Sequence, residues 1–335
     1  ACSYAFFGQT HLMLARLPSV LAAALGALGT FLLGRLLYGV WAGFVAGLLL
    51  LSTFLWANWA VVCRMDMVMS VGLLWTTLFA AMGARANSTA ARWMWVGASG
   101  LALGGAALSK GFVPVLTGAG LVALAWVCLS DRKWSTVPVV CLVLAIGVTL
   151  LSLWATATAD TDFLLGFCQF QTGGTGPKHV SSWHYYLTRF PLNLLPWAVW
   201  LPFAMWNAVQ RLDRRSGQPR AFPLLVLISG IVAFSISSNK RVHYLLPLVP
   251  FAVLLVADFI VMHLRDLHTG ASGQRVIRWP LVLMLGASPF VGLGILFSQH
   301  GRSGSWFLPA IAALCPIMAL GIAGIRQVHR RRLRA

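Results

Sequence analysis

The run Ser237-Ser-Asn-Lys240-Arg241-Val-His243-Tyr-Leu-Leu-Pro-Leu-Val-Pro250 sets two cations and a histidine directly before a long apolar segment. That segment, residues 245–264, is long enough to cross a membrane as a helix. The basic cluster then lies at the membrane boundary, where cations suit an anionic lipid head group whose tail lies beside the helix. The stretch predicts a membrane protein with its working face at this boundary.

The composition of the whole chain agrees with this prediction. The 335 residues are 59% hydrophobic and 10% charged, and the mean hydropathy is +0.80, which is too apolar for a soluble domain of this length. A spanning helix needs about 20 mostly apolar residues to cross roughly 30 Å of hydrocarbon. We therefore predict an all-α, polytopic integral membrane protein. Its eleven expected spans are residues 16–38, 41–62, 67–84, 92–109, 112–129, 137–157, 186–207, 222–238, 245–264, 279–298 and 306–325.

The placement of the cations predicts the orientation in the membrane. Seventeen of the 25 Lys and Arg residues fall on one side of these spans, and the positive-inside rule assigns that side to the cytoplasm. The chain then starts outside and ends inside, and its net charge of +18 reflects topology, not nucleic-acid binding. Eight cations remain on the outer side: Arg16, Arg64, Lys110, Lys178, Arg189, Lys240, Arg241 and Arg302.

Three regions follow from the hydropathy pattern. Residues 1–15 are expected to form an outer interfacial segment, 16–264 a transmembrane core with a long outer loop at 158–185, and 265–335 two further helices and a basic cytoplasmic tail. The three prolines within 186–207 predict a kinked or re-entrant span. The chain begins with Ala1 on the outer side and has seven Asp and no Glu, which suggests that an upstream helix and loop precede it. The six cysteines show no metal or redox spacing.

Two of the outer motifs carry isolated charges at helix ends. Asp66 lies at a membrane boundary, where an acid must be solvated, paired or functional, and Arg64 is close enough to be its partner. Lys110 lies in an outer turn, where a lysine either snorkels to water or binds a phosphate. For Asp66, a simple ion pair and a role in a site both remain open.

The other two outer motifs combine cations with aromatic residues. Lys178 and His179 end the long loop just before Tyr185, and Lys240, Arg241 and His243 lead to Tyr244. Tyrosines at this level are usually membrane-interface residues, whereas histidine suits acid-base chemistry, metal ligation or a hydrogen bond to phosphate. Four separate loops therefore bring cations to one face, as a site for a lipid-linked phosphate requires.

In this order the motifs resemble those of the polytopic glycosyltransferases of the GT-C superfamily, of the ArnT-like and protein O-mannosyltransferase type (glycosyltransferase family 39). The likeness covers most of the chain up to about residue 264. The matching elements are Ala15-Arg-Leu-Pro-Ser19, Gly34-Arg-Leu-Leu-Tyr-Gly39, Asp66, Ser109-Lys-Gly111, His179 six residues before Tyr185-Tyr186, Pro196-Trp197, and Ser237 to Pro247.

The resemblance implies transfer of a sugar from a polyprenyl phosphate to a lipid, such as a lipid A-like molecule, or to a protein, at the outer face of a bacterial inner membrane. It implies an inverting displacement in which Lys110, Lys240 and Arg241 hold the donor phosphate. The family's acidic first-loop motif is absent here, so Asp66 is expected to support the site and not to act as the general base. Members differ in metal use, so a divalent ion near His179 stays open and no other cofactor is implied.

A non-enzymatic transporter or lipid flippase is the alternative. Such a protein is expected to carry charges in mid-span or an inverted repeat. The main deep-lying acid is Asp258, near the inner end of its span, and no repeat is evident. Clustering on one face favours an enzyme.

Overall fold

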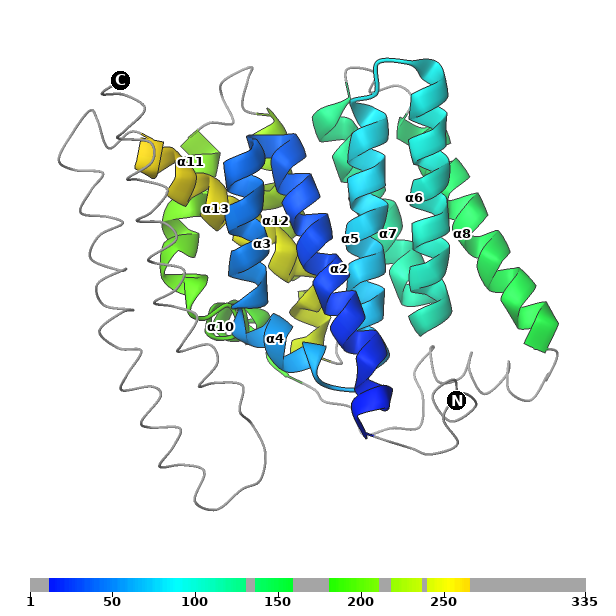
Figure 1. Cartoon of the computed structure of the whole chain (residues 1–335), viewed down its shortest axis with the longest axis horizontal. Coiled ribbons are helices and arrows are strands. Elements are labelled where there is room, and N and C mark those ends of the chain that lie inside the picture. Colours follow the sequence, from blue (N-terminus) through cyan, green and yellow to red (C-terminus); the bar gives the residue numbers. More distant parts are fainter. Residues whose placement is uncertain (1–11, 131–135, 159–180, 211–217, 237–239, 266–335) are drawn as a thin grey trace.

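The computed structural model describes residues 12–130, 136–158, 181–210, 218–236 and 240–265. Every regular element in these ranges is helical (Figure 1). The α-helices are α2 (Leu12–Tyr38), α3 (Val40–Leu51), α4 (Phe54–Ala60), α5 (Met65–Ala84), α6 (Thr89–Lys110), α7 (Phe112–Leu129), α8 (Thr136–Thr158), α10 (Tyr185–Asn193), α11 (Leu201–Gln210), α12 (Gln218–Ile236) and α13 (Val249–Arg265). Two 3₁₀ helices complete them, η2 (Trp197–Trp200) and η3 (Val242–Leu248).

The predicted all-α membrane architecture is confirmed for this part of the chain. Five of its helices are long and apolar enough to cross a membrane, and the bent pair α3–α4 makes a sixth if it counts as one span. The total of eleven remains a prediction, because the expected spans 279–298 and 306–325 lie outside the described residues. Residues 1–11 of the expected interfacial segment also lie outside, and its last residues already belong to α2.

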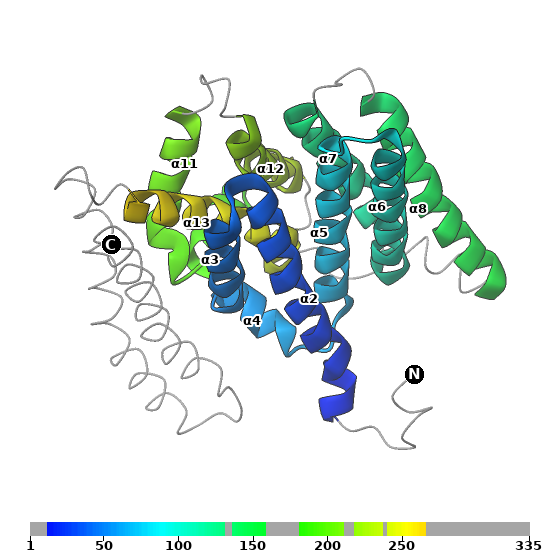
Figure 2. The same cartoon turned by 45° about the horizontal axis from the view of Figure 1, so that its top comes forward.

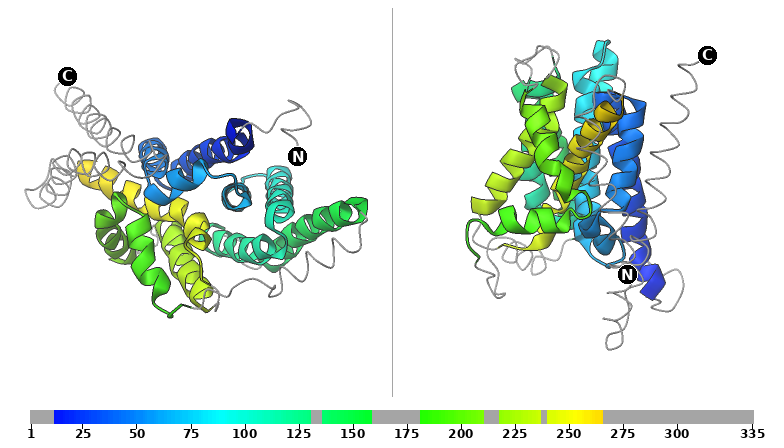
Figure 3. Two further views of the ribbon diagram at one scale, coloured as in Figure 1. Left: turned by 90° about the horizontal axis from the view of Figure 1, so that it is seen from below. Right: turned by 90° about the vertical axis from the view of Figure 1, so that its left-hand side faces the viewer.

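Helix α13 is the centre of the fold. Every residue from Leu245 in η3 to Val261 in α13 is buried. All of them are apolar except Asp258, as expected for a segment enclosed by other helices. Seen from the end where α10 lies, α13 passes between α2–α4 on one side and α11–α12 on the other (Figure 3). The long helices α5 to α8 stand together beside α2 (Figure 2).

The expected span at 41–62 is present as two helices, and the chain bends by 63° between α3 and α4, which the sequence analysis did not predict. Two hydroxyls bond back to the preceding turn, Ser52 Oγ to Leu48 O at 2.9 Å and Thr53 Oγ1 to Leu49 O at 2.7 Å. Such side-chain bonds compete with the helical ladder and often bend helices. The amide of Phe54 donates instead to Leu195 O at 2.9 Å, so the bend is tied to a distant segment.

The predicted interruption of span 186–207 is confirmed. The structure divides this stretch into α10, η2 and α11. Trp197 on η2 is 2% exposed, and its indole Nε1 donates to Ser52 Oγ at 3.1 Å. The bend between α3 and α4 and the segment between α10 and η2 are therefore joined by hydrogen bonds near one end of the bundle.

Among the described residues, cations of the two predicted groups lie at opposite ends of the helices. Arg35 and Arg85 lie where α2 and α5 end, and Arg85 donates a hydrogen bond to the carbonyl of Leu36. At the other end of the bundle, Lys110 closes α6 and Arg241 precedes η3. One end therefore gathers the expected site residues.

Close packing of α5 on α6 yields a prediction. A Cβ on Gly72 would lie 2.8 Å from the Cβ of Ala106, whereas a Cβ on Gly105 would meet nothing within 4 Å. Overpacking a tight contact costs about 1–3 kcal/mol. We expect Gly72→Leu to lower the melting temperature of the detergent-solubilised protein and Gly105→Leu to leave it unchanged or slightly higher. Equal melting temperatures for the two variants would contradict this packing.

Candidate functional site

A pocket of about 480 Å³ opens at the end of the bundle where α4, α5, α10 and η3 meet. Its volume lies in the range of small-molecule sites. It combines cations with aromatic rings, and its lining residues are Asn58, Trp59, Val62, Arg64, Tyr185, Lys240, Arg241, Val242 and His243. Such a lining suits an anion attached to a less polar group.

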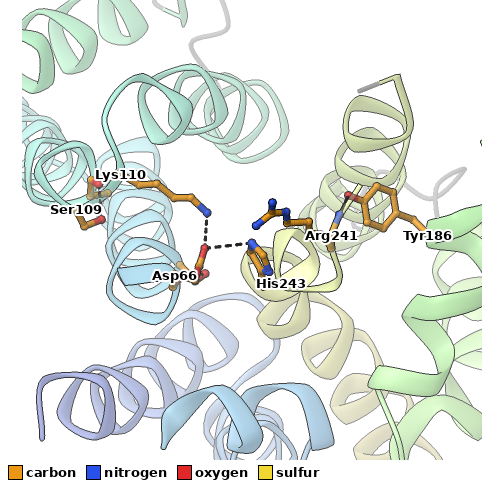
Figure 4. Close-up of polar contacts among 8 residues, drawn as sticks. Asp66, Ser109, Lys110, Tyr186, Arg241 and His243 are labelled. Atoms are coloured by element: carbon orange, nitrogen blue, oxygen red, sulfur yellow. Dashed lines mark hydrogen bonds and ion pairs between the residues drawn. The ribbon is translucent and has the colours of Figure 1, made fainter. Parts of the chain in front are cut away.

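An ion pair between Asp66 and Lys110 lies beside this pocket (Figure 4). Asp66 is in the first turn of α5 and Lys110 in the last turn of α6, the helix ends that the macrodipole makes favourable for an acid and a base respectively. The side chains are 8% and 23% exposed, so the attraction is stronger than between charges in water. Gly111, at φ +71°, allows the sharp turn that follows Lys110.

The imidazole of His243 approaches this ion pair from η3. Its Nε2 lies 3.9 Å from Asp66 Oδ1, and its ring centroid lies 5.0 Å from that of Trp59. Lys110 Nζ lies 5.0 Å from the ring centroid of Tyr244. The carboxylate of Asp66 therefore faces basic groups from both α6 and η3.

Arg241 is held through its backbone. Its amide donates to the hydroxyl of Tyr186 at 3.1 Å, and that hydroxyl donates to the Arg241 carbonyl at 3.4 Å. A phenol hydroxyl can donate one hydrogen bond and accept another, so this group can bond to both backbone groups of Arg241. Figure 4 shows the guanidinium directed away from Tyr186, toward Lys110 and His243. Its Nε atom is buried and has no hydrogen-bond partner among the described residues.

Arg64 was considered as a possible partner of Asp66, and the structure gives Asp66 a different partner. Asp66 pairs with Lys110, and the Arg64 guanidinium carbon lies 5.3 Å from the ring centroid of Trp59. Arg64 has an extended backbone, with φ −141° and ψ 150°, just outside the helix that contains Asp66. Proximity in sequence therefore did not identify the partner, which comes from the end of the next helix.

The structure brings most of the predicted site residues to one place. Five line the pocket: Arg64, Tyr185, Lys240, Arg241 and His243. Asp66, Lys110 and Tyr244 lie next to it through the contacts above. Lys178 and His179 fall outside the described residues, so their place in the site stays a prediction.

Sequence reasoning missed three residues of this region. Trp59 and Asn58 line the pocket from α4, but without the bend they read as part of an ordinary span. Tyr186 was noted only as half of a Tyr-Tyr pair, and its full burial is set by tertiary packing. A tyrosine hydroxyl beside an otherwise apolar stretch was the available signal, since a buried phenol needs a partner.

A divalent metal was left open by the sequence. In the described ranges, no group of three His, Cys, Asp or Glu side chains is placed to hold a metal ion. His179, the residue suggested for such a role, is outside those ranges. Metal use therefore stays a prediction.

Comparison with known proteins relates the chain to membrane glycosyltransferases. The family described as dolichyl-phosphate-mannose-protein mannosyltransferase matches residues 1–155. The undecaprenyl phosphate-alpha-4-amino-4-deoxy-L-arabinose arabinosyl transferase 2 of Pseudomonas fluorescens is 32% identical, over 88% of this chain and 53% of that protein. The corresponding transferase of Pseudomonas aeruginosa is also 32% identical, over 79% of this chain and 49% of that protein. The chain thus spans about half the length of the curated relatives it matches.

A solved structure shares the fold. ArnT from Cupriavidus metallidurans in its apo state superposes with a TM-score of 0.70 at 25% identity, covering 98% of this chain and 60% of that one. Its form bound to undecaprenyl phosphate gives a TM-score of 0.69 at 24% identity. These comparisons confirm the resemblance that the motifs suggested.

The Asp66–Lys110 pair gives a second prediction. Removing one partner of a fully buried pair costs about 3–5 kcal/mol, and we expect Lys110→Met to cost roughly 1–3 kcal/mol because Lys110 is partly exposed. The double variant Asp66→Asn with Lys110→Met should recover much of this loss, because no unpaired carboxylate remains. Thermal unfolding in detergent measures both. A double variant no more stable than Lys110→Met would contradict the pairing.

Proposed function

We propose that this chain, an ArnT-like protein of the GT-C superfamily, takes part in transferring a sugar from a polyprenyl phosphate to an acceptor at the outer face of the bacterial inner membrane. The acceptor that we propose is a lipid A-like molecule, as the resemblance implies, and a protein is the alternative. Because the chain covers only part of those relatives, activity, substrates and partners are all part of the proposal.

The observation that carries the proposal is the convergence of cations on one pocket. Arg64 comes from the start of α5, and Lys240 and Arg241 come from the approach to η3. The buried Nε of Arg241, which has no partner in the described ranges, is a donor in need of an acceptor. A phosphate oxygen supplies an acceptor with a charge that suits all three cations.

The names of the relatives support a polyprenyl phosphate as the bound phosphate. Those transferases are named for undecaprenyl phosphate as the carrier of their sugar. The pocket lies at the end of the buried helix α13 and not at its middle. A polyprenyl chain can therefore lie in the hydrocarbon while its phosphate reaches these cations.

The proposed reaction is a single displacement with inversion. An acceptor oxygen forms a bond to the anomeric carbon, the bond from that carbon to the phosphate oxygen breaks, and polyprenyl phosphate leaves with the electron pair. The acceptor's proton passes to a general base. Lys240 and Arg241 stabilise the charge that grows on the departing phosphate, and Lys110 does so from the edge of the site.

Asp66 has a supporting role in this proposal. Its carboxylate is engaged by Lys110 and faces His243. The carboxylate contacts these side chains of the protein, and Asp66 is not among the residues that line the pocket. Asp66 therefore orients the basic groups at the edge of the pocket instead of accepting the acceptor's proton.

The polar side chains within the described spans favour this proposal over transport. Thr30, Thr76 and Thr77 are buried, and each hydroxyl bonds to a carbonyl of its own helix at 2.8 Å. These groups are satisfied locally and do not form a polar path. The buried acid Asp258 lies in α13 and not in the pocket lining. Among the described residues, the cations Arg64, Lys240 and Arg241 gather at one pocket, which suits a reaction at a membrane face.

Substitution of the pocket cations tests the proposal. We expect Lys240→Ala and Arg241→Ala each to lower kcat/KM for an undecaprenyl-phosphate-linked sugar at least about tenfold, the value of one charge-assisted hydrogen bond. Arg189→Ala is the matched control, because Arg189 is exposed at the same end and stacks on Tyr185 at 5.9 Å without lining the pocket. Transfer is measured in membranes with the amount of protein normalised. Normal turnover by both pocket variants would refute the assignment.

The orientation of the site is tested separately. Cys63 is exposed next to Arg64, and Asn87 is exposed in the turn between α5 and α6 at the opposite end. With Cys63 as the only cysteine, an impermeant maleimide added outside spheroplasts should label the protein. A cysteine-free protein carrying Asn87→Cys should react only after permeabilisation. The reverse pattern would place the pocket in the cytoplasm.

A further inference from the structure

The contacts of Tyr186 reach across the site in a way that its neighbours do not. Its ring is fully buried, 5.2 Å from the ring of Tyr185 and 6.3 Å from that of Phe234 on α12. Its hydroxyl is bonded to both polar backbone groups of Arg241, 55 residues further along the chain. One side chain therefore joins α10, α12 and the approach to η3.

These two hydrogen bonds fix the position of the Arg241 backbone, from which the Arg241 side chain extends into the pocket. Arg241 has an extended backbone, with φ −136° and ψ 142°, and it precedes η3 without a side-chain cap. Its amide donates to the Tyr186 hydroxyl at 3.1 Å. Its carbonyl accepts from the Tyr244 amide at 3.1 Å, the bond that begins η3, and also from the Tyr186 hydroxyl at 3.4 Å. The guanidinium leaves this anchored backbone on the side away from Tyr186 (Figure 4).

We infer that Tyr186 is a positioning residue for anion binding, acting through Arg241 and not by contact with the ligand. Its hydroxyl holds the Arg241 backbone so that the buried Nε and the rest of the guanidinium face the pocket. This inference rests on the proposed function, because it takes a polyprenyl phosphate as the anion. Tyr185, from the same turn of α10, lines the pocket directly. The two tyrosines therefore have different roles: Tyr185 forms part of the pocket wall, and Tyr186 holds a residue of that wall in place.

Removing only the hydroxyl tests the inference. Tyr186→Phe keeps the buried ring and loses one bonding group, so we expect the Kd for undecaprenyl phosphate to rise about three- to tenfold. The KM for the donor should rise by a similar factor while kcat changes less than twofold. Thr188→Val is the matched control, because it removes an exposed hydroxyl from the same helix whose bond goes to Tyr185 O at 3.0 Å.

A double-mutant cycle separates positioning from general stability. If Tyr186 acts through Arg241, adding Tyr186→Phe to Arg241→Ala should not weaken undecaprenyl phosphate binding further. Equal losses in the two backgrounds would overturn the inference, and so would an unchanged Kd with only a lower melting temperature. In the wild-type protein the Arg241 amide should exchange its hydrogen slowly. Rapid exchange would overturn the contact itself, even if Tyr186→Phe did not accumulate.

The same measurements keep the two proposals apart. If the wild-type protein in nanodiscs binds undecaprenyl phosphate and Tyr186→Phe binds it equally well, the positioning role fails and the proposed function stands. If the wild-type protein shows no binding, the phosphate assignment fails and the positioning role with it.

Discussion

The structure depends on the enclosure of one helix. Helix α13 and the end of η3 are buried along residues 245–261, which are apolar except for Asp258, so the neighbouring helices surround them. Lipid tails are as apolar as these apolar side chains, and the enclosure is therefore maintained by close packing and not by exclusion from water. Because α13 is central, the residues that precede it also lie centrally at one end of the bundle. Lys240, Arg241 and His243 thus meet the ends of several other helices.

The electrostatics of that end follow from how the helices are arranged. Antiparallel α5 and α6 bring an N-terminal turn beside a C-terminal turn, and each supplies the charge that its helix end favours. Asp66 is the one carboxylate at this end among the described residues, and it faces Lys110 and His243. Arg64 and Arg241 are not drawn into this pair. The carboxylate therefore organises the edge of the site while leaving cationic side chains directed to the pocket.

Local sequence patterns predicted the helices and the end at which the cations gather, but not the contacts between segments. A helix that crosses a membrane must be apolar over its length, so the spans can be predicted from the sequence. The unequal number of cations in successive loops follows from the topology, so the two ends of the bundle can be told apart. The bend at Ser52 and Thr53 could not be read, because hydroxyls within helices often bond back without bending them. The partner of Asp66 and the role of Tyr186 depend on which helix ends meet, and spacing along the chain carries no such information. For this reason the sequence offered Arg64 as a possible partner of Asp66, whereas the structure pairs Asp66 with Lys110.

The apolar segment that includes α13 also sets the level of the pocket relative to the bilayer. A charge at the centre of a bilayer costs about 2.5–3.5 kcal/mol on insertion scales, and the cost falls near the interface. An apolar run as long as 245–257 keeps Lys240 and Arg241 at the boundary and prevents them from entering the hydrocarbon. A lipid-linked phosphate is confined to the same depth, since its tail cannot leave the bilayer and its charge cannot enter it. The length of this apolar run therefore does more than anchor the protein, because it brings the cations to the level at which such a phosphate lies.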